Sequence, residues 1–195
     1  MIRHFLSIFS SALALLALFG CGQSTPLGPA VESPTSQPGA APASALGTVP
    51  WKESYQAFGT ITADASCPAP LLLVSLEGDG TATHVGKYTI VNSHCVDPTT
   101  GALTNGTFVK TAANGDQIFG TYIGSTTVIQ PPAPVGIFEV DGTLTFTGGT
   151  GRFAGATGTA TMEGSLESDF SQAGIPTQVT LVMIGSISTP GSANH

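Results

Sequence analysis

The stretch Phe138-Glu139-Val140-Asp141-Gly142-Thr143-Leu144-Thr145-Phe146 alternates apolar and polar residues along most of its length. Successive side chains of a β-strand point to opposite faces, so this pattern predicts a strand with its two phenylalanines, Val140 and Leu144 on a buried face. Seven other segments have a related pattern, and no segment after residue 50 has a helical period. The eight predicted strands are Tyr55–Ala63, Pro70–Glu77, Thr81–Asn92, Thr104–Thr111, Gln117–Thr126, Gly136–Thr147, Ala156–Glu167 and Gln178–Ser188.

Eight antiparallel strands can form either a two-layer sandwich or a closed barrel. The pair Asn114-Gly115 lies between two predicted strands and is a strong signal for a tight hairpin, because both residues adopt positive φ there. We favour the barrel because closure removes exposed sheet edges. The predicted fold is therefore an all-β, eight-stranded antiparallel closed β-barrel, which is wide enough to be filled by side chains or to hold one small ligand.

A glycine-rich run at the end of the predicted strand Gly136–Thr147 resembles a motif of a known family. The sequence from Phe146 to Gly158, FTGGTGRFAGATG, resembles the GGTG-[KR]-F hairpin of the allene oxide cyclase and dirigent barrel superfamily. Two upstream runs, 78–86 and 113–117, resemble elements of bacterial relatives in that group. The resemblance extends from Tyr55 to Ser188 and implies the same eight-stranded barrel. Plant members are cyclases of an unstable fatty-acid epoxide or guides of phenoxy-radical coupling, but their polar residues have no match here, so no activity is carried over.

The glycine run also has a structural interpretation. Gly148, Gly149 and Gly151 allow backbone angles that a Cβ would forbid. We expect Phe153 to fold under this turn and close one end of the barrel, with Arg152 donating hydrogen bonds to loop carbonyls. The run lacks the Lys-Ser/Thr and the helix of a phosphate-binding loop.

The first 20 residues have the form of an export signal. Arg3 precedes an apolar run from Phe5 to Phe19, which is shorter than the ~20 residues of a membrane-spanning helix. The end of the run, Leu18-Phe19-Gly20-Cys21, resembles the bacterial lipobox. The resemblance implies cleavage before Cys21, attachment of diacylglycerol to its thiol and acylation, for example with palmitate, of its amine. The alternatives are an ordinary secreted protein with an incidental cysteine and a permanent membrane helix.

The predicted organisation has four parts. After the signal peptide (1–20) come the lipidated Cys21 and a linker rich in Pro, Ser and Ala (21–50), which has too few large apolar side chains to fold. The barrel domain (51–189) and a disordered tail (190–195) follow. The predicted location is the bacterial cell envelope, with a lipid anchor in the membrane and the domain outside the cytoplasm. Gly22 after the cysteine favours the outer membrane in enteric-type sorting.

The charge composition narrows the range of partners. Charged residues make up 9% of the chain, and five Lys and Arg against 12 Asp and Glu give a formal net charge of −7. Binding to phosphate backbones needs clustered cationic side chains, so nucleic acid is not an expected partner.

Cys67 and Cys95 remain as a pair once Cys21 is lipidated. In an exported domain such a pair is expected to form a disulfide. A catalytic thiol is the alternative, since His94 adjoins Cys95, but neighbours on a strand point to opposite faces.

Candidate ligand-binding residues are His84, Tyr88, Glu139, Asp141 and Glu163. Glu139 and Asp141 share one face of the predicted strand Gly136–Thr147. If that face pointed inward, the two carboxylates would be buried and would suggest a site. The other interpretation places the apolar residues of this strand in the core and the acids in solvent. No metal-site spacing, cofactor motif, Gly-x-Ser-x-Gly elbow or other catalytic constellation is found.

These observations support three hypotheses. In the first, the barrel of an anchored lipoprotein binds a small hydrophobic ligand or a protein partner without catalysis. In the second, it is a cyclase or isomerase for a hydrophobic substrate, with polar side chains converging inside the barrel. In the third, it is a structural module of the envelope that acts through its surface. The oligomeric state is left open.

Overall fold

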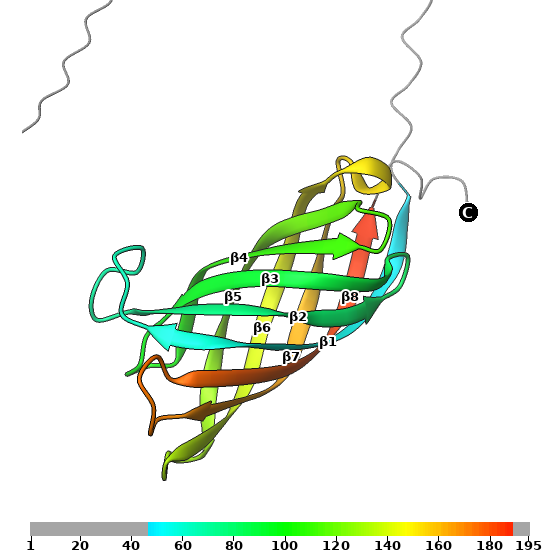
Figure 1. The fold of residues 1–195 in the computed structure, drawn as a ribbon. Coiled ribbons are helices and arrows are strands. Elements are labelled where there is room, and N and C mark those ends of the chain that lie inside the picture. Colours follow the sequence, from blue (N-terminus) through cyan, green and yellow to red (C-terminus); the bar gives the residue numbers. More distant parts are fainter. Residues whose placement is uncertain (1–46, 189–195) are drawn as a thin grey trace, which may run out of the picture. The chain divides into compact units, whose positions relative to one another are not determined.

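Each predicted strand has a counterpart in the computed structural model, which describes residues 47–188 (Figure 1). The predicted strand Thr81–Asn92 is wrong at its start, because Thr81 and Ala82 belong to β2 and a turn at 83–85 precedes β3. Every strand pairs antiparallel with its neighbours in sequence, and β8 pairs with β1. The prediction of an eight-stranded antiparallel closed barrel is confirmed. The elements are β1 (Thr48–Thr62), β2 (Leu72–Ala82), β3 (Gly86–Val96), β4 (Ala102–Ala112), β5 (Gln117–Gln130), β6 (Val135–Gly149), the 3-10 turn η1 (Gly151–Phe153), β7 (Thr157–Asp169) and β8 (Pro176–Ser188).

The predicted signal peptide, Cys21, the linker as far as residue 46 and the C-terminal tail lie outside the described residues. The end of the predicted linker does not. Thr48-Val49-Pro50 form the start of β1, before the predicted first strand at Tyr55, and pair with Ser188-Ile187-Ser186 of β8. The wholly buried Trp51 follows directly and belongs to the core.

The two ends of the barrel differ. Short hairpins at residues 83–85 and 113–116 and the turn at 150–156 cover one end, which we call the closed end. The loops at 63–71, 97–101, 131–134 and 170–175 surround the other end, which we call the mouth. β1 begins at the closed end and runs toward the mouth.

The glycine run caps the closed end. Phe153 is buried beneath the turn, and a Cβ on Gly149 would lie 2.7 Å from the Cβ of Phe153, so this close approach requires glycine. Arg152 Nη2 donates a hydrogen bond to the carbonyl of Val85 at 3.2 Å, and its Nε lies 3.6 Å from Asp116 Oδ2. This capping turn therefore joins three hairpins at the closed end.

An ion pair is enclosed in the core near the closed end. Lys110 Nζ of β4 donates to Glu53 Oε2 of β1 at 2.5 Å, and neither side chain is exposed. Trp51 Nε1 donates to the same oxygen at 2.9 Å, and the Tyr88 hydroxyl donates to Glu53 Oε1. Gly80 makes room for this phenol, since a Cβ there would lie 2.3 Å from the Tyr88 oxygen.

Aromatic rings surround the Lys110 ammonium group. Its Nζ lies 4.7 Å from the ring centre of Phe108, 5.3 Å from that of Trp51 and 5.8 Å from that of Phe146. Burial lowers the pKa of Lys110, and the Glu53 carboxylate opposes this effect. Cation–π attraction and the ion pair together offset part of the cost of removing both charges from water.

Removal of one member of this ion pair is expected to destabilise the barrel strongly. Lys110→Met leaves the Glu53 carboxylate buried without its cation, so the free energy of unfolding should fall by about 3–5 kcal/mol. The double variant Glu53→Gln/Lys110→Met buries no net charge and should lose much less. Urea unfolding followed by circular dichroism checks both, and a double variant no more stable than Lys110→Met would contradict the coupling.

Candidate ligand-binding cavity

A cavity of about 540 Å³ opens at the mouth, within the volume range of small-molecule sites. Its walls are mainly aliphatic and aromatic, because apolar residues at the mouth ends of the strands and in the mouth loops line it. Phe138 and Phe170 add a ring pair with centres 6.2 Å apart. The apolar lining residues are Ile61, Leu72, Val74, Val96, Pro98, Leu103, Val128, Pro132, Phe138, Leu166, Phe170 and Ile175.

The loop at 97–101 places polar residues at the rim of the cavity, and hydrogen bonds within the loop hold them. Asp97 Oδ1 accepts hydrogen bonds from the amides of Thr99 at 2.8 Å and Thr100 at 3.3 Å. These bonds lower the pKa of Asp97, so its carboxylate is charged at neutral pH. The rim therefore carries negative charge above an apolar wall.

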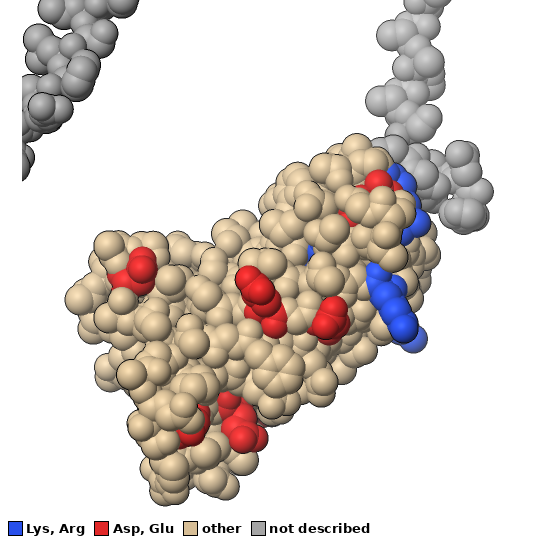
Figure 2. Space-filling view, viewed as in Figure 1, with Lys and Arg blue, Asp and Glu red and all other residues tan. Residues whose placement is uncertain are grey.

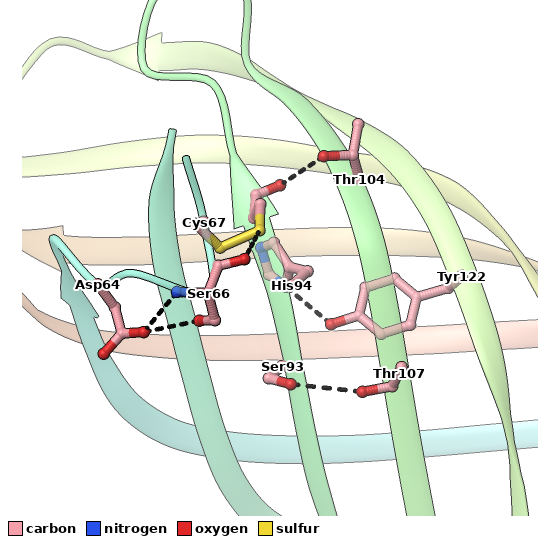
Figure 3. Close-up of a disulfide and its surroundings, with 9 residues drawn as sticks. Asp64, Ser66, Cys67, Ser93, His94, Thr104, Thr107 and Tyr122 are labelled. Carbon is pink, nitrogen blue, oxygen red and sulfur yellow. Dashed lines mark hydrogen bonds between the residues drawn. A yellow bond between two sulfur atoms is a disulfide. The ribbon is translucent and has the colours of Figure 1, made fainter. Parts of the chain in front are cut away.

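His94 of β3 forms the floor of the cavity. Its Nδ1 and the Tyr122 hydroxyl of β5 are hydrogen-bonded at 2.7 Å, with the rings edge to face (Figure 3). Gly106 of β4, which lies between these strands, leaves space for the phenol, since a Cβ there would be 2.7 Å from the Tyr122 ring. Burial lowers the pKa of His94 to about 4 and raises that of Tyr122. Both groups are therefore neutral at pH 7.

Beneath this pair lies a second pair of polar side chains. Asn92 Nδ2 donates to the Tyr55 hydroxyl at 3.4 Å. Asn92 is 4% exposed, and its Oδ1 is the one buried side-chain nitrogen or oxygen without a hydrogen-bond partner between residues 47 and 188. It borders a narrow space of about 20 Å³ that shares His94, Leu103, Thr126 and Leu166 with the cavity above.

The predicted disulfide is confirmed and holds one side of the mouth. Cys67 in the loop at 63–71 is bonded to Cys95 of β3, with their Cα atoms 5.6 Å apart (Figure 3). In the chain-entropy model this crosslink stabilises the fold by about 3–4 kcal/mol. Because Cys95 has no free thiol, a Cys–His catalytic pair with His94 is excluded.

The five residues proposed from sequence do not line this cavity. Glu139, Asp141 and Glu163 are exposed on the outer wall, because the apolar residues of β6 and β7 take the inward positions. The structure therefore agrees with the interpretation that places these acids in solvent, and they do not form a site inside the barrel. His84 is exposed in the β2–β3 turn at the closed end, and Tyr88 is inside the barrel but bonded to Glu53.

The sequence did not lead to the polar residues at and below the cavity floor, although the pattern of β3 indicates two of them. Asn92 and His94 continue the alternate positions of Tyr88 and Ile90, so they belong to the inward stripe of the strand. A polar residue in such a stripe indicates a buried hydrogen-bonding group. Tyr122 has the same kind of position in β5.

A second hollow, of about 680 Å³, lies on the outer wall across β1, β2 and β3. It is bordered by Gly78 and Gly80 and by the exposed Phe58, Asp79 and Lys87. It is a shallower, more solvent-open surface than the mouth cavity.

Comparison with protein-family models, curated proteins and solved structures found no match for this chain. Among residues 47–188, no helix has the length and apolarity needed to cross a membrane. The same residues contain no group of three or more His, Cys, Asp and Glu side chains placed to hold a metal ion.

The neutral state of His94 makes the stability depend on pH. Its pKa is about 4 when folded and about 6.5 when unfolded, so the unfolded chain binds the proton more readily. The stabilising contribution is complete above pH 6.5 and is lost as the pH falls toward 4, with a magnitude of about 3 kcal/mol. Urea unfolding at pH 7 and pH 4 measures it.

His94→Gln is the matched control, because it keeps a neutral polar side chain that does not titrate. Carboxylates contribute equally to both proteins, so the difference between their pH profiles isolates His94. Identical profiles would contradict a buried neutral imidazole.

Proposed function

We propose that the barrel binds a small, mainly apolar molecule in the mouth cavity and does not transform it. The cavity itself is the supporting observation. The inward residues of the closed half fill its interior, whereas those of the mouth half leave about 540 Å³ open to solvent between apolar walls. Burial of apolar ligand surface against these walls supplies the binding free energy.

A cyclase or isomerase is the second candidate, because His94 at the cavity floor is hydrogen-bonded to Tyr122 beneath it. The binding function is favoured over it for a reason of acid–base chemistry. General acid–base catalysis is most effective when the pKa of the catalytic group lies near the working pH. A histidine of pKa about 4 is a weak base, and the raised pKa of Tyr122 makes its hydroxyl a weak acid.

We also propose that the barrel belongs to a lipoprotein of the bacterial cell envelope, anchored through Cys21. The lipobox-like Leu18-Phe19-Gly20-Cys21 supports the anchor, and stable anchoring needs more than one acyl chain. The allene oxide cyclase/dirigent-like kinship rests on the run FTGGTGRFAGATG, which forms the capping turn of an eight-stranded barrel. A protein partner on the outer wall, where Val91, Val109 and Ile184 are exposed, is the alternative.

Binding to the cavity can be tested with a neutral apolar fluorophore. Titration of the full-length protein with N-phenylnaphthylamine should give saturable fluorescence enhancement. Leu166→Trp places a large side chain inside the cavity and should weaken binding at least about tenfold, since it occupies ligand volume. Ile184→Trp, the same kind of change on the exposed outer wall, should leave binding unchanged. Equal binding by both variants would locate the dye elsewhere.

The anchor can be tested by labelling. Cells that make lipoproteins and express the full chain should incorporate an alkyne-tagged palmitate into the protein, which should remain with membranes. Cys21→Ser should lose both the label and the membrane association. Cys67→Ser/Cys95→Ser keeps Cys21 and should retain them. Labelling of the Cys21→Ser protein would contradict the proposal that Cys21 carries the lipid.

A further inference from the structure

The groups at the inner end of the cavity are polar but uncharged. His94 and Tyr122 are neutral and bonded to each other, and Asn92 and Tyr55 are bonded just below them. The one group left over is Asn92 Oδ1, a buried acceptor without a donor. An unpaired buried acceptor is costly, so a ligand that supplies a donor here gains affinity that a ligand without one does not.

Cations are absent from this part of the described barrel. Lys52, Lys87 and Arg152 lie near the closed end, and Lys110 is bonded to Glu53. None of them lines the cavity. In Figure 2 the larger areas of Lys and Arg surface lie toward the end where β1 begins, away from the mouth.

Acidic side chains, in contrast, surround the mouth. Asp64, Asp97 and Asp169 lie in or next to its loops, and hydrogen bonds from neighbouring residues lower the pKa of each. An anionic ligand would be repelled at the rim and would find no counter-ion at the floor. A cation that passed the rim would also meet only neutral groups there.

We propose that the cavity selects an uncharged ligand with an apolar body and a hydroxyl or N–H donor at one end, inserted with that end first to donate to Asn92 Oδ1. This inference rests on the proposed binding function and names the ligand class. The narrow space of about 20 Å³ beside Asn92 suits a group no larger than a hydroxyl. His94 and Leu166 border both this space and the main cavity, so the apolar body lies above them.

Three ligands of similar size separate the effect of a hydrogen-bond donor from the effect of a negative charge. Calorimetric titration of the full-length protein at pH 7 compares n-octanol, its isomer n-heptyl methyl ether, which accepts but cannot donate, and octanoate, which is anionic. We expect n-octanol to bind at least about tenfold more tightly than the ether, the size of effect that one hydrogen bond to a buried acceptor gives. Octanoate should bind most weakly.

Asn92→Leu should remove the preference for the alcohol over the ether while the ether still binds. Thr161→Val is the control, since it removes a hydroxyl from the exposed outer wall and leaves Asn92 in place, and it should keep the preference. The comparison of the three ligands on the unmodified protein tests the donor requirement and the selection against charge even where a variant folds poorly.

The two proposals fail in different ways. Binding of none of the three ligands and of no neutral dye would overturn the binding function itself. Equal affinity for alcohol and ether would leave the binding function in place and overturn the donor requirement, as expected if Asn92 is satisfied by water alone. Octanoate binding as tightly as n-octanol would overturn the selection against charge.

Discussion

The hydrogen-bonded pairing of β8 with β1 is the constraint on which the rest of the structure depends. It runs from Thr48 opposite Ser188 to Thr60 opposite Pro176, and it leaves the sheet without an edge. Once the sheet is closed, each strand has one face inside and one outside, so alternate residues have no choice of environment. Any polar residue at an inward position must then find its partner within the barrel.

The interior divides into a filled half and a hollow half because of the sizes of the inward side chains. Trp51, Phe108 and Phe146 pack edge to face around the buried ammonium of Lys110 in the closed half. Toward the mouth, smaller aliphatic side chains such as Val74 and Leu103 do not meet across the barrel. The cavity is thus a consequence of where the large aromatic residues stand in the sequence.

Much of the fold was predictable because it depends on local pattern. The alternation in Phe138–Phe146, the Asn114-Gly115 turn and the glycine run each indicate a strand or a turn from a few adjacent residues. The start of β1 was missed because Pro50 and the prolines before it resemble linker, whereas its place in the sheet is set by pairing with β8, far away in sequence. The cysteine pair followed from chemistry and from the expected export.

The candidate site was largely unpredictable for a related reason. Glu139 and Asp141 of β6 were candidates because they are charged residues within a strand. Both are at outward positions, where a charge is solvated. Glu53 and Lys110 have the inward parity of Tyr55 and Phe108, so the charges that matter were visible as exceptions within apolar stripes. Which inward polar residues meet, as His94 meets Tyr122, depends on the stagger between neighbouring strands, and one strand's sequence does not encode it.

Both ends of the described chain leave the barrel at its closed end, since Gly47 precedes β1 and Ser188 ends β8. A force applied through the residue before β1 would therefore enter the barrel at the closed end, at the opposite end of the strands from the mouth. Such a force would act first on the Thr48–Ser188 pair, the outermost pair between β1 and β8. The mouth, where the Cys67–Cys95 disulfide crosslinks a loop to β3, lies at the other end of the strands and would be loaded last.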